Sequence, residues 1–247
     1  MTATAYIGTS GWNYQGWKDG FYRDVPKKNW LEFCADKFPA IEVNATFYGL
    51  QKRSTFEKWH ARTPADFRFA IKGNRFLTHN KKLLDPHDSI KLEQQRACGL
   101  GEKLSAVLWQ LPGKLTKDAA RLETFVDALG RWRTTRHAME FRHPSWFDDE
   151  VAGVLSRHRV AVCLSDAADW PMWDKVTTDL VYIRLHGHDR TYASAYGPDR
   201  LREWAIRVRE WLSQGHDVHV YFDNDAEGAA PYDALSLLEL VNEKAPA

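Results

Sequence analysis

The amino-acid sequence predicts a single-domain (β/α)₈ barrel of the TIM type over residues 1–247, on three observations. Short apolar segments rich in β-forming residues alternate with segments of helical periodicity. Eight such apolar segments recur at intervals of about thirty residues, and the length of 247 residues fits a fold that usually has about 250. A doubly wound open sheet is the alternative, but the first turn, Gly8-Thr9-Ser10-Gly11-Trp12, is not the GxGxxG motif with which such sheets usually begin.

The predicted strands are short and apolar, as buried parallel strands are. In chain order they are Ala5–Ser10, Ala40–Ala45, Phe67–Lys72, Ser105–Gln110, His137–Arg142, Val160–Ser165, Leu180–His186 and Asp217–Asp223. The predicted helices place apolar residues three or four positions apart. They are Trp30–Lys37, Arg53–Ala61, Ser89–Leu100, Asp118–Leu129, Asp148–Arg157, Asp199–Leu212 and Pro231–Asn242.

Local signals support these helix boundaries. Asp118 and Asp148 stand near helix starts, and Gly130 and Gly215 stand just past helix ends. The segment Gly73–Asp88 is polar and lacks periodicity, so we predict a long loop at the rim of the barrel.

Composition excludes several classes of protein. The chain has 34 Lys and Arg against 33 Asp and Glu, and this net charge of +1 provides no general attraction for nucleic acid or an anionic membrane. Cys34, Cys98 and Cys163 are odd in number and far apart, which argues against a disulfide framework or a structural zinc site. No leader or membrane-spanning segment is recognisable, so we expect a cytoplasmic protein.

Polar residues follow the strands at the end where barrels carry their chemistry. Period two places Glu42, Asn44 and Thr46 on one face of the second strand. The same spacing places Glu140 and Arg142 on one face of the fifth strand, and Arg184 and His186 on one face of the seventh. Charged side chains on the inward face of parallel strands are costly unless they are paired or functional. These strands therefore predict a charged site at the carboxyl end of the barrel.

Seven runs of residues together resemble the family called domain of unknown function 72 (YecE-like). They are Gly8–Trp12, Glu42–Asn44 with Thr46–Tyr48, Phe69–Lys72, Trp109–Pro112, Glu140–Trp146, Tyr182–Gly187 and Tyr221–Asn224. The resemblance covers the chain from about Tyr6 to Leu240. It implies a TIM-type barrel, and it implies neither an established reaction nor a settled set of catalytic residues.

The favoured hypothesis is an enzyme, needing no metal or cofactor, that acts on a small anionic substrate. The substrate would bear phosphate or carboxylate and be sugar-like or nucleotide-like. Glu42, Glu140 and His186 are the expected acid/base residues. The expected substrate-binding residues are Trp12, Asn44, Tyr48, Lys72, Gln110, Arg142, His143, Trp146, Asp166, Arg184 and Asn224. Hydrolysis, isomerisation and lyase chemistry all remain open, and oligomeric state is not predicted.

Two other functions remain open. An endonuclease-like, metal-dependent barrel would draw ligands from His79, His143, His186, Glu42, Glu140, Asp166 and Asp223, although the nearby cations oppose metal binding. A nucleic-acid-binding module would use the loop Thr191–Arg200. The basic stretch Arg131–His137 precedes the fifth strand and should therefore lie at the opposite end of the barrel.

Structural roles could also account for some of these residues. Glu42 with Lys72, and Glu140 with Arg142 and Arg184, could be structural ion pairs, and His143 could be a turn residue before Pro144.

Overall fold

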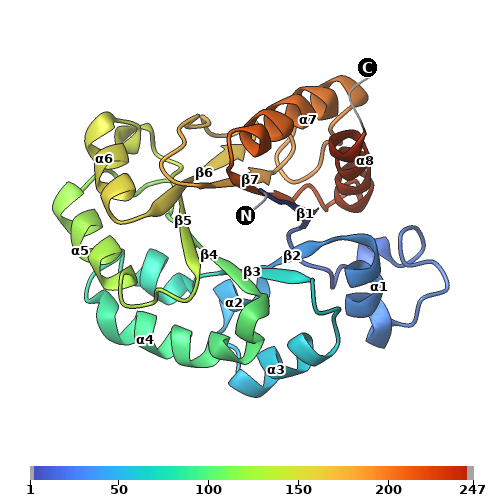
Figure 1. Cartoon of the computed structure of the whole chain (residues 1–247), viewed down its shortest axis with the longest axis horizontal. Helices are drawn as coiled ribbons and strands as arrows, with labels where there is room; N and C mark the ends of the chain where they lie inside the picture. The colour runs from blue at the N-terminus through green and yellow to red at the C-terminus, as the bar shows by residue number, and fades with distance from the viewer. Residues whose placement is uncertain (1–2, 244–247) are drawn as a thin grey trace.

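The computed structural model describes residues 3–243, which form a ring of eight parallel strands surrounded by helices (Figure 1). The strands are β1 (Ala5–Thr9), β2 (Ala40–Val43), β3 (Arg68–Lys72), β4 (Leu104–Gln110), β5 (Arg136–Glu140), β6 (Val160–Asp166), β7 (Leu180–Leu185) and β8 (Asp217–Phe222). They are hydrogen-bonded in the order β1-β8-β7-β6-β5-β4-β3-β2. The predicted (β/α)₈ barrel is confirmed.

The ring closes between β1 and β2 through a short seam. Ser10 and Glu42 form an isolated parallel bridge, and the Gly11 amide donates to the Glu42 carbonyl at 2.7 Å. A side chain at Gly8 would collide with the Ala40 carbonyl oxygen, so this seam requires glycine in β1.

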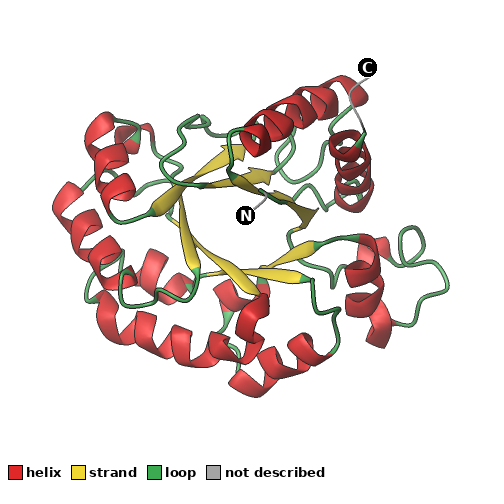
Figure 2. Cartoon of the chain, in the orientation of Figure 1, coloured by secondary structure: helices red, strands yellow, loops and turns green. Residues whose placement is uncertain are grey.

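Helices occupy seven of the eight sectors outside the strands (Figure 2). They are α1 (Trp30–Lys37), α2 (Ala45–Tyr48), α3 (Arg53–Ala61), α4 (Pro86–Ala97), α5 (Ala119–Leu129), α6 (Asp149–Arg157), α7 (Pro198–Ser213) and α8 (Ala230–Asn242), with 3₁₀ turns at Gln15–Trp17, Lys27–Asn29, Cys98–Lys103 and Pro144–Trp146. Within residues 3–243 the connection from β6 to β7 has no helix. No helix of this part of the chain has the length and hydropathy needed to cross a membrane.

All seven predicted helices are present, and their caps behave as expected. The Asp118 carboxylate accepts from the Arg121 amide at 3.0 Å, and Asp148 accepts from the Val151 amide at 2.9 Å. The prediction of a loop over residues 73–88 was partly wrong. A π-helical turn covers Phe76–Asn80, and α4 begins at Pro86, because proline fixes a backbone angle that suits the first helical position.

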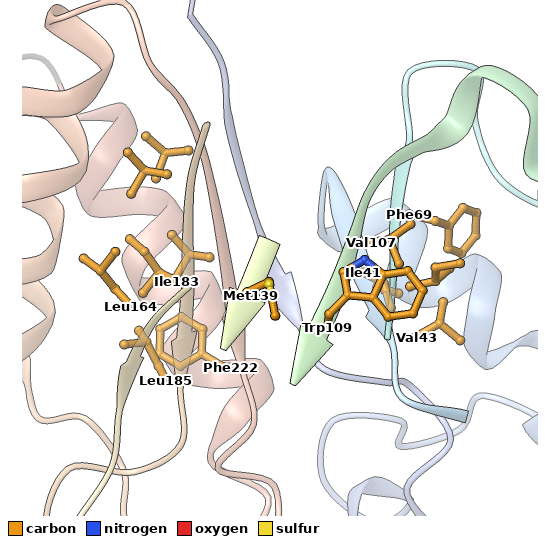
Figure 3. Close-up of a cluster of buried hydrophobic side chains, with 14 of the residues drawn as sticks. Ile41, Val43, Phe69, Val107, Trp109, Met139, Leu164, Ile183, Leu185 and Phe222 are labelled. Atoms are coloured by element: carbon orange, nitrogen blue, oxygen red, sulfur yellow. The ribbon is translucent and has the colours of Figure 1, made fainter. Parts of the chain in front are cut away.

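The outward faces of the strands form the main hydrophobic core with the helices. Figure 3 labels ten of these residues, which come from β2 to β8. Alternation then sends the remaining residues of each strand into the barrel. Near the amino end this interior is uncharged, with small residues such as Ala40, Ala70 and Ala138 packed against Tyr182 and Tyr221.

Charge begins two residues further along the same strands. The inward alanines are followed by inward charged residues in three strands, as Ala40 and Glu42, Ala70 and Lys72, and Ala138 and Glu140. The barrel interior is therefore divided into an uncharged amino half and a charged carboxyl end.

Candidate functional site

A buried arginine holds the carboxyl end of the barrel together. Arg184, in β7, is fully buried and donates from Nη2 to Glu42 at 2.8 Å and to Asp223 at 2.9 Å. Its Nη1 donates to Glu140 at 3.0 Å and to His186 Nε2 at 3.1 Å. We call Glu42, Glu140, Arg184, His186 and Asp223 the charged centre.

Two carboxylates of the charged centre, those of Glu140 and Asp223, are kept ionised by their cationic neighbours. Burial alone would raise the pKa of Glu140, but Arg142 and Arg184 hold it well below its ordinary value. Burial would likewise raise the pKa of Asp223, and Arg184 again lowers it. Such groups are fixed anions at neutral pH and do not exchange protons there readily.

Glu42 is the most completely satisfied member of the charged centre. Besides its contacts with Arg184, it accepts from the Tyr182 hydroxyl at 2.6 Å and from the Ser10 hydroxyl. The Arg184 guanidinium lies among the carboxylates of Glu42, Glu140 and Asp223. Within residues 3–243 no group of three His, Cys, Asp or Glu side chains is arranged to hold a metal ion.

His186 is neutral in this environment. Burial and then Arg184 lower its pKa. Its Nε2 accepts from Arg184, so the ring proton lies on Nδ1, 3.0 Å from Asp223 but without the alignment of a hydrogen bond. The ring is therefore held in one tautomer.

Arg142 covers the charged centre from the solvent side. Its Nε donates to Glu140 at 2.7 Å, and Nη1 donates to the Tyr192 hydroxyl at 3.2 Å. The guanidinium lies 3.9 Å from the ring centroid of Trp170, whose indole N–H donates to Ser165. Tyr192 has φ of 64°, a strained value for a residue other than glycine, so the loop that carries it is held in place against a local preference.

Lys72 differs from the other charged residues here. Its side chain at the end of β3 is buried, yet among the residues described the ammonium has no hydrogen bond or ion pair; the Phe47 ring lies 4.4 Å away. Burial, followed by repulsion from Arg184, lowers its pKa to about 8. The ion pair of Glu42 with Lys72 that the sequence suggested is not formed, because Arg184 has taken the carboxylate.

Three cations converge around His79, which follows β3. Burial and then the charges of Lys72, Arg75 and Arg142 lower the pKa of His79 to about 4. Arg75 and Lys72 both approach the Phe47 ring, at 6.0 and 4.4 Å from its centroid. We call Lys72, Arg75 and Arg142 the cation site.

A second acid, Asp225, was missed by the sequence analysis. It lies two residues beyond Asp223, and burial followed by repulsion from Asp223 raises its pKa to about 7. The period-two spacing of these aspartates was the available signal. Tyr14 lies near Asp223 and Asp225. Burial raises the pKa of Tyr14, and the charges of these two aspartates raise it further.

A cavity of about 550 Å³ adjoins the charged centre next to the ends of β1 and β2. Its aromatic lining comprises Trp12, Tyr14, Trp30, Tyr48 and Trp59, and we call it the aromatic groove. Asn44 links the two regions, because it lines the groove and its Nδ2 donates to Asp223 at 3.3 Å. Three predicted binding residues, Trp12, Asn44 and Tyr48, thus meet in this groove.

Other predicted binding residues have structural partners. Trp146 is buried against Phe141, and its indole N–H donates to the Leu115 carbonyl at 2.7 Å. His143 accepts from the Ser145 amide at 3.2 Å and caps a 3₁₀ turn.

The remaining three predicted binding residues also contact groups of the protein. Asn224 donates to Asp233 at 2.7 Å, Asp166 contacts His188 at 2.9 Å, and Gln110 donates to the Leu111 carbonyl at 2.7 Å. Thr46, expected on the face of the second strand, instead lies in α2 and donates to the Lys72 carbonyl at 2.7 Å, because β2 ends at Val43.

Another cavity, of about 700 Å³, opens at the amino end of the barrel. It is lined by several arginines of the basic stretch, including Arg131 and Arg133, and by Arg159. None of the charged centre lines it, and none lines the aromatic groove, but Asn44 of the groove donates to Asp223. Because barrel enzymes place their chemistry at the carboxyl end, we regard the smaller aromatic groove as the functional cavity.

Comparison with known proteins agrees with this fold. A family model described as "Protein of unknown function DUF72" matches residues 6–247. The chain is similar to the UPF0759 protein YunF of Bacillus subtilis (strain 168), with 26% identity over 274 residues, covering 96% of this chain and 94% of that protein.

Two solved structures share the architecture along almost the whole chain. A DUF72 family protein from Thermotoga maritima superimposes with a TM-score of 0.81 at 26% identity, covering 97% of this chain and 100% of that chain. One from Enterococcus faecalis V583 gives a TM-score of 0.83 at 19% identity, covering 98% and 97%, which is a likeness of fold. With the family model matching almost every residue, this chain belongs to the DUF72 family.

Proposed function

We propose that this protein is an enzyme that acts on a small anionic substrate at the carboxyl end of the barrel. The observation that carries the proposal is that Lys72 and Arg75 approach the Phe47 ring at 4.4 and 6.0 Å from its centroid, and that this ring packs against His79 at 5.0 Å. Arg142 is also near enough to lower the pKa of His79. Arg75 is exposed and Arg142 is paired with Glu140, whereas Lys72 is buried, and a buried cation is costly unless something neutralises it. A phosphate or carboxylate group at the cation site would supply the missing partner of the Lys72 ammonium.

Preorganisation supports this role for the cation site. Arg142 is held by Glu140, Tyr192 and Trp170, so little side-chain entropy is lost when an anion binds. Arg184 and Arg142 offset part of the negative charge of the three carboxylates beneath, which reduces their repulsion of the substrate.

Proton transfer would fall to groups whose pKa lies near neutral pH. Asp225, with a pKa raised to about 7, and Lys72, with a pKa lowered to about 8, meet that condition. Glu42, Glu140 and His186, the acid/base residues expected from the sequence, would instead hold Arg184 and orient the cation site.

The first test is calorimetric titration of sulfate, whose charge is constant near neutral pH, into the protein and two variants. Lys72→Met and Arg75→Gln should each weaken sulfate binding by roughly tenfold, as expected for loss of a charged contact worth more than 1 kcal/mol. Arg133→Gln, at the amino-end cavity, should leave it unchanged. Equal weakening by Arg133→Gln, or no binding at all, would refute the cation site.

A second measurement tests catalysis separately from binding. The protein is incubated with a mixture of phosphorylated and carboxylated metabolites, and consumption is followed by mass spectrometry. Asp225→Asn should abolish turnover and keep sulfate affinity. Turnover that survives this substitution would remove Asp225 from the proposal.

A further inference from the structure

We propose that the aromatic groove binds the base of a mononucleotide whose phosphate occupies the cation site. This inference rests on the proposed function, and it names the substrate class of that site.

The walls of the groove suit a flat ring. Trp12 and Trp59 meet edge to face at 5.3 Å, and Tyr48 beside them leaves 73% of its surface exposed. An exposed aromatic ring at a cavity mouth offers a stacking surface, which every base can use. At about 550 Å³, the groove has the size of a small-ligand pocket and suits one nucleotide better than a strand.

One polar atom in the groove lacks a partner. Asn44 Oδ1 is buried and has no hydrogen bond, while its Nδ2 donates to Asp223 and to the Ser10 carbonyl, both at 3.3 Å. A buried amide oxygen without a donor is costly. The exocyclic amine of a base such as adenine would supply that donor.

The charges around the groove favour a nucleotide over an uncharged sugar. No carboxylate lines the groove in the described part of the chain, whereas Lys27 and Lys28 do; Arg62 lines it too, but its guanidinium is paired with Glu32 at 2.6 Å. Sugar hydroxyls need many hydrogen-bonding partners, and Asn13 and Asn44 are the side-chain amides here. The groove is therefore better suited to a heterocycle attached to an anion.

The short helix α2 brings the groove and the cation site within reach of one ligand. Phe47 faces the cation site, with Lys72 Nζ 4.4 Å from its ring centroid. The next residue, Tyr48, lines the groove, and the two rings are 5.1 Å apart. A base on Tyr48 and a phosphate at Lys72 therefore lie on opposite sides of one helical turn.

The test compares three probes by calorimetry: inorganic phosphate, ribose 5-phosphate and adenosine 5′-monophosphate. The nucleotide should bind roughly tenfold or more tightly than ribose 5-phosphate. Tyr48→Ala should remove that advantage and leave the affinities for inorganic phosphate and ribose 5-phosphate unchanged. Tyr48→Phe should keep it, as should Tyr232→Ala, an exposed tyrosine on α8 away from the groove.

The outcomes separate this inference from the proposed function. If both phosphate probes bind and the nucleotide binds no more tightly, the nucleotide inference fails and the cation site stands. If no probe binds, both fail. If an oligoadenylate strand binds more tightly than the mononucleotide, with a steep dependence on salt, the groove is a nucleic-acid site and the mononucleotide inference is overturned.

Discussion

Two buried lysines at opposite ends of the barrel show how this protein uses charge. Lys103, at the amino end of β4, donates to the carbonyls of His60 and Thr63 at 2.6 and 2.7 Å and to the Thr63 hydroxyl at 3.2 Å. Lys72, at the carboxyl end of β3, is buried to a similar degree and has no such partner within residues 3–243. The first ammonium joins the start of β4 to the carboxyl-terminal end of α3, and the second has no protein partner among the described residues.

The same contrast extends through the barrel interior. At the amino end His219 is buried, which lowers its pKa to about 3, so it is neutral beside Tyr221 and Tyr182. At the carboxyl end Arg184 is charged and surrounded by carboxylates. Buried charged groups, including the unpaired ammonium of Lys72, thus gather at the carboxyl end of the barrel, and such groups are typical of functional sites.

The largest expected effect comes from removing the cation at the centre of the charged end. Arg184→Met leaves three carboxylates without their guanidinium, so the free energy of unfolding should fall by roughly 3–5 kcal/mol at pH 7. Arg184 lowers the pKa of Glu140 and Asp223, so its contribution exists above their ordinary pKa and is lost as pH falls. Urea unfolding should therefore show a smaller difference in unfolding free energy between the wild type and Arg184→Met in acid than at pH 7.

The matched control for Arg184 is Arg136→Met at the amino end. Arg136 is partly exposed and pairs with Asp179 at 3.2 Å and Asp217 at 2.9 Å. Exposed pairs contribute under about 1 kcal/mol. If the two variants lost equal stability, the distinction between the two ends would not hold.

The next largest effect should come from Lys103→Met. This change removes the ammonium donor from the His60 carbonyl, at the end of α3, and from the Thr63 carbonyl just beyond it, so the free energy of unfolding should fall by about 1–3 kcal/mol. Sulfate affinity, measured by calorimetry, should be unchanged. A loss of sulfate binding would mean that the amino-end lysine contributes to the site.

Lys72→Met should change the free energy of unfolding in the opposite direction and stabilise the protein. Replacing an unpaired buried ammonium with an apolar side chain should raise the free energy of unfolding by about 1–2 kcal/mol at pH 7. The folded-state pKa of Lys72 is about 8, below its ordinary value. The free energy of unfolding of the wild type therefore rises as the pH is raised above 8. The advantage of Lys72→Met over the wild type should shrink in that range. If Lys72→Met destabilised the protein, the contrast between a paired Lys103 and an unpaired Lys72 would not hold.

The smallest expected effect is on the pH dependence of sulfate affinity. Lys72 loses its charge as pH rises through its pKa of about 8, so binding should weaken about tenfold between pH 7 and pH 9. Lys72→Arg remains charged and should give a flat profile over the same range. A wild-type profile as flat as that of the arginine variant would show that Lys72 does not contact the anion.

Much of the fold could be predicted from the sequence because its signals are local. Alternation and turn residues placed all eight strands close to their observed ends, and the 3.6-residue period placed seven helices. The π-helical turn at Phe76–Asn80 escaped prediction, since five residues are too few to show a period. The inward direction of Glu42, Glu140 and Arg184 also followed from alternation.

The roles of the charged residues depended on tertiary contacts. Trp146 belongs to a run typical of the family, but the rotation of its 3₁₀ turn buries it against Phe141. The raised pKa of Asp225 depends first on burial and then on the nearby charge of Asp223; the two-residue spacing indicates that the two acids are close, but it does not reveal the burial.

The sequence by itself determined a (β/α)₈ barrel and the strands whose ends carry charge, because side-chain alternation and helical period are properties of neighbouring residues. Only the tertiary structure decided which cation neutralises which carboxylate. Arg184 reaches three strands' acids at once, and this leaves Lys72 without an anion. Electrostatic energy depends on distance through space, and the closure of the ring sets those distances.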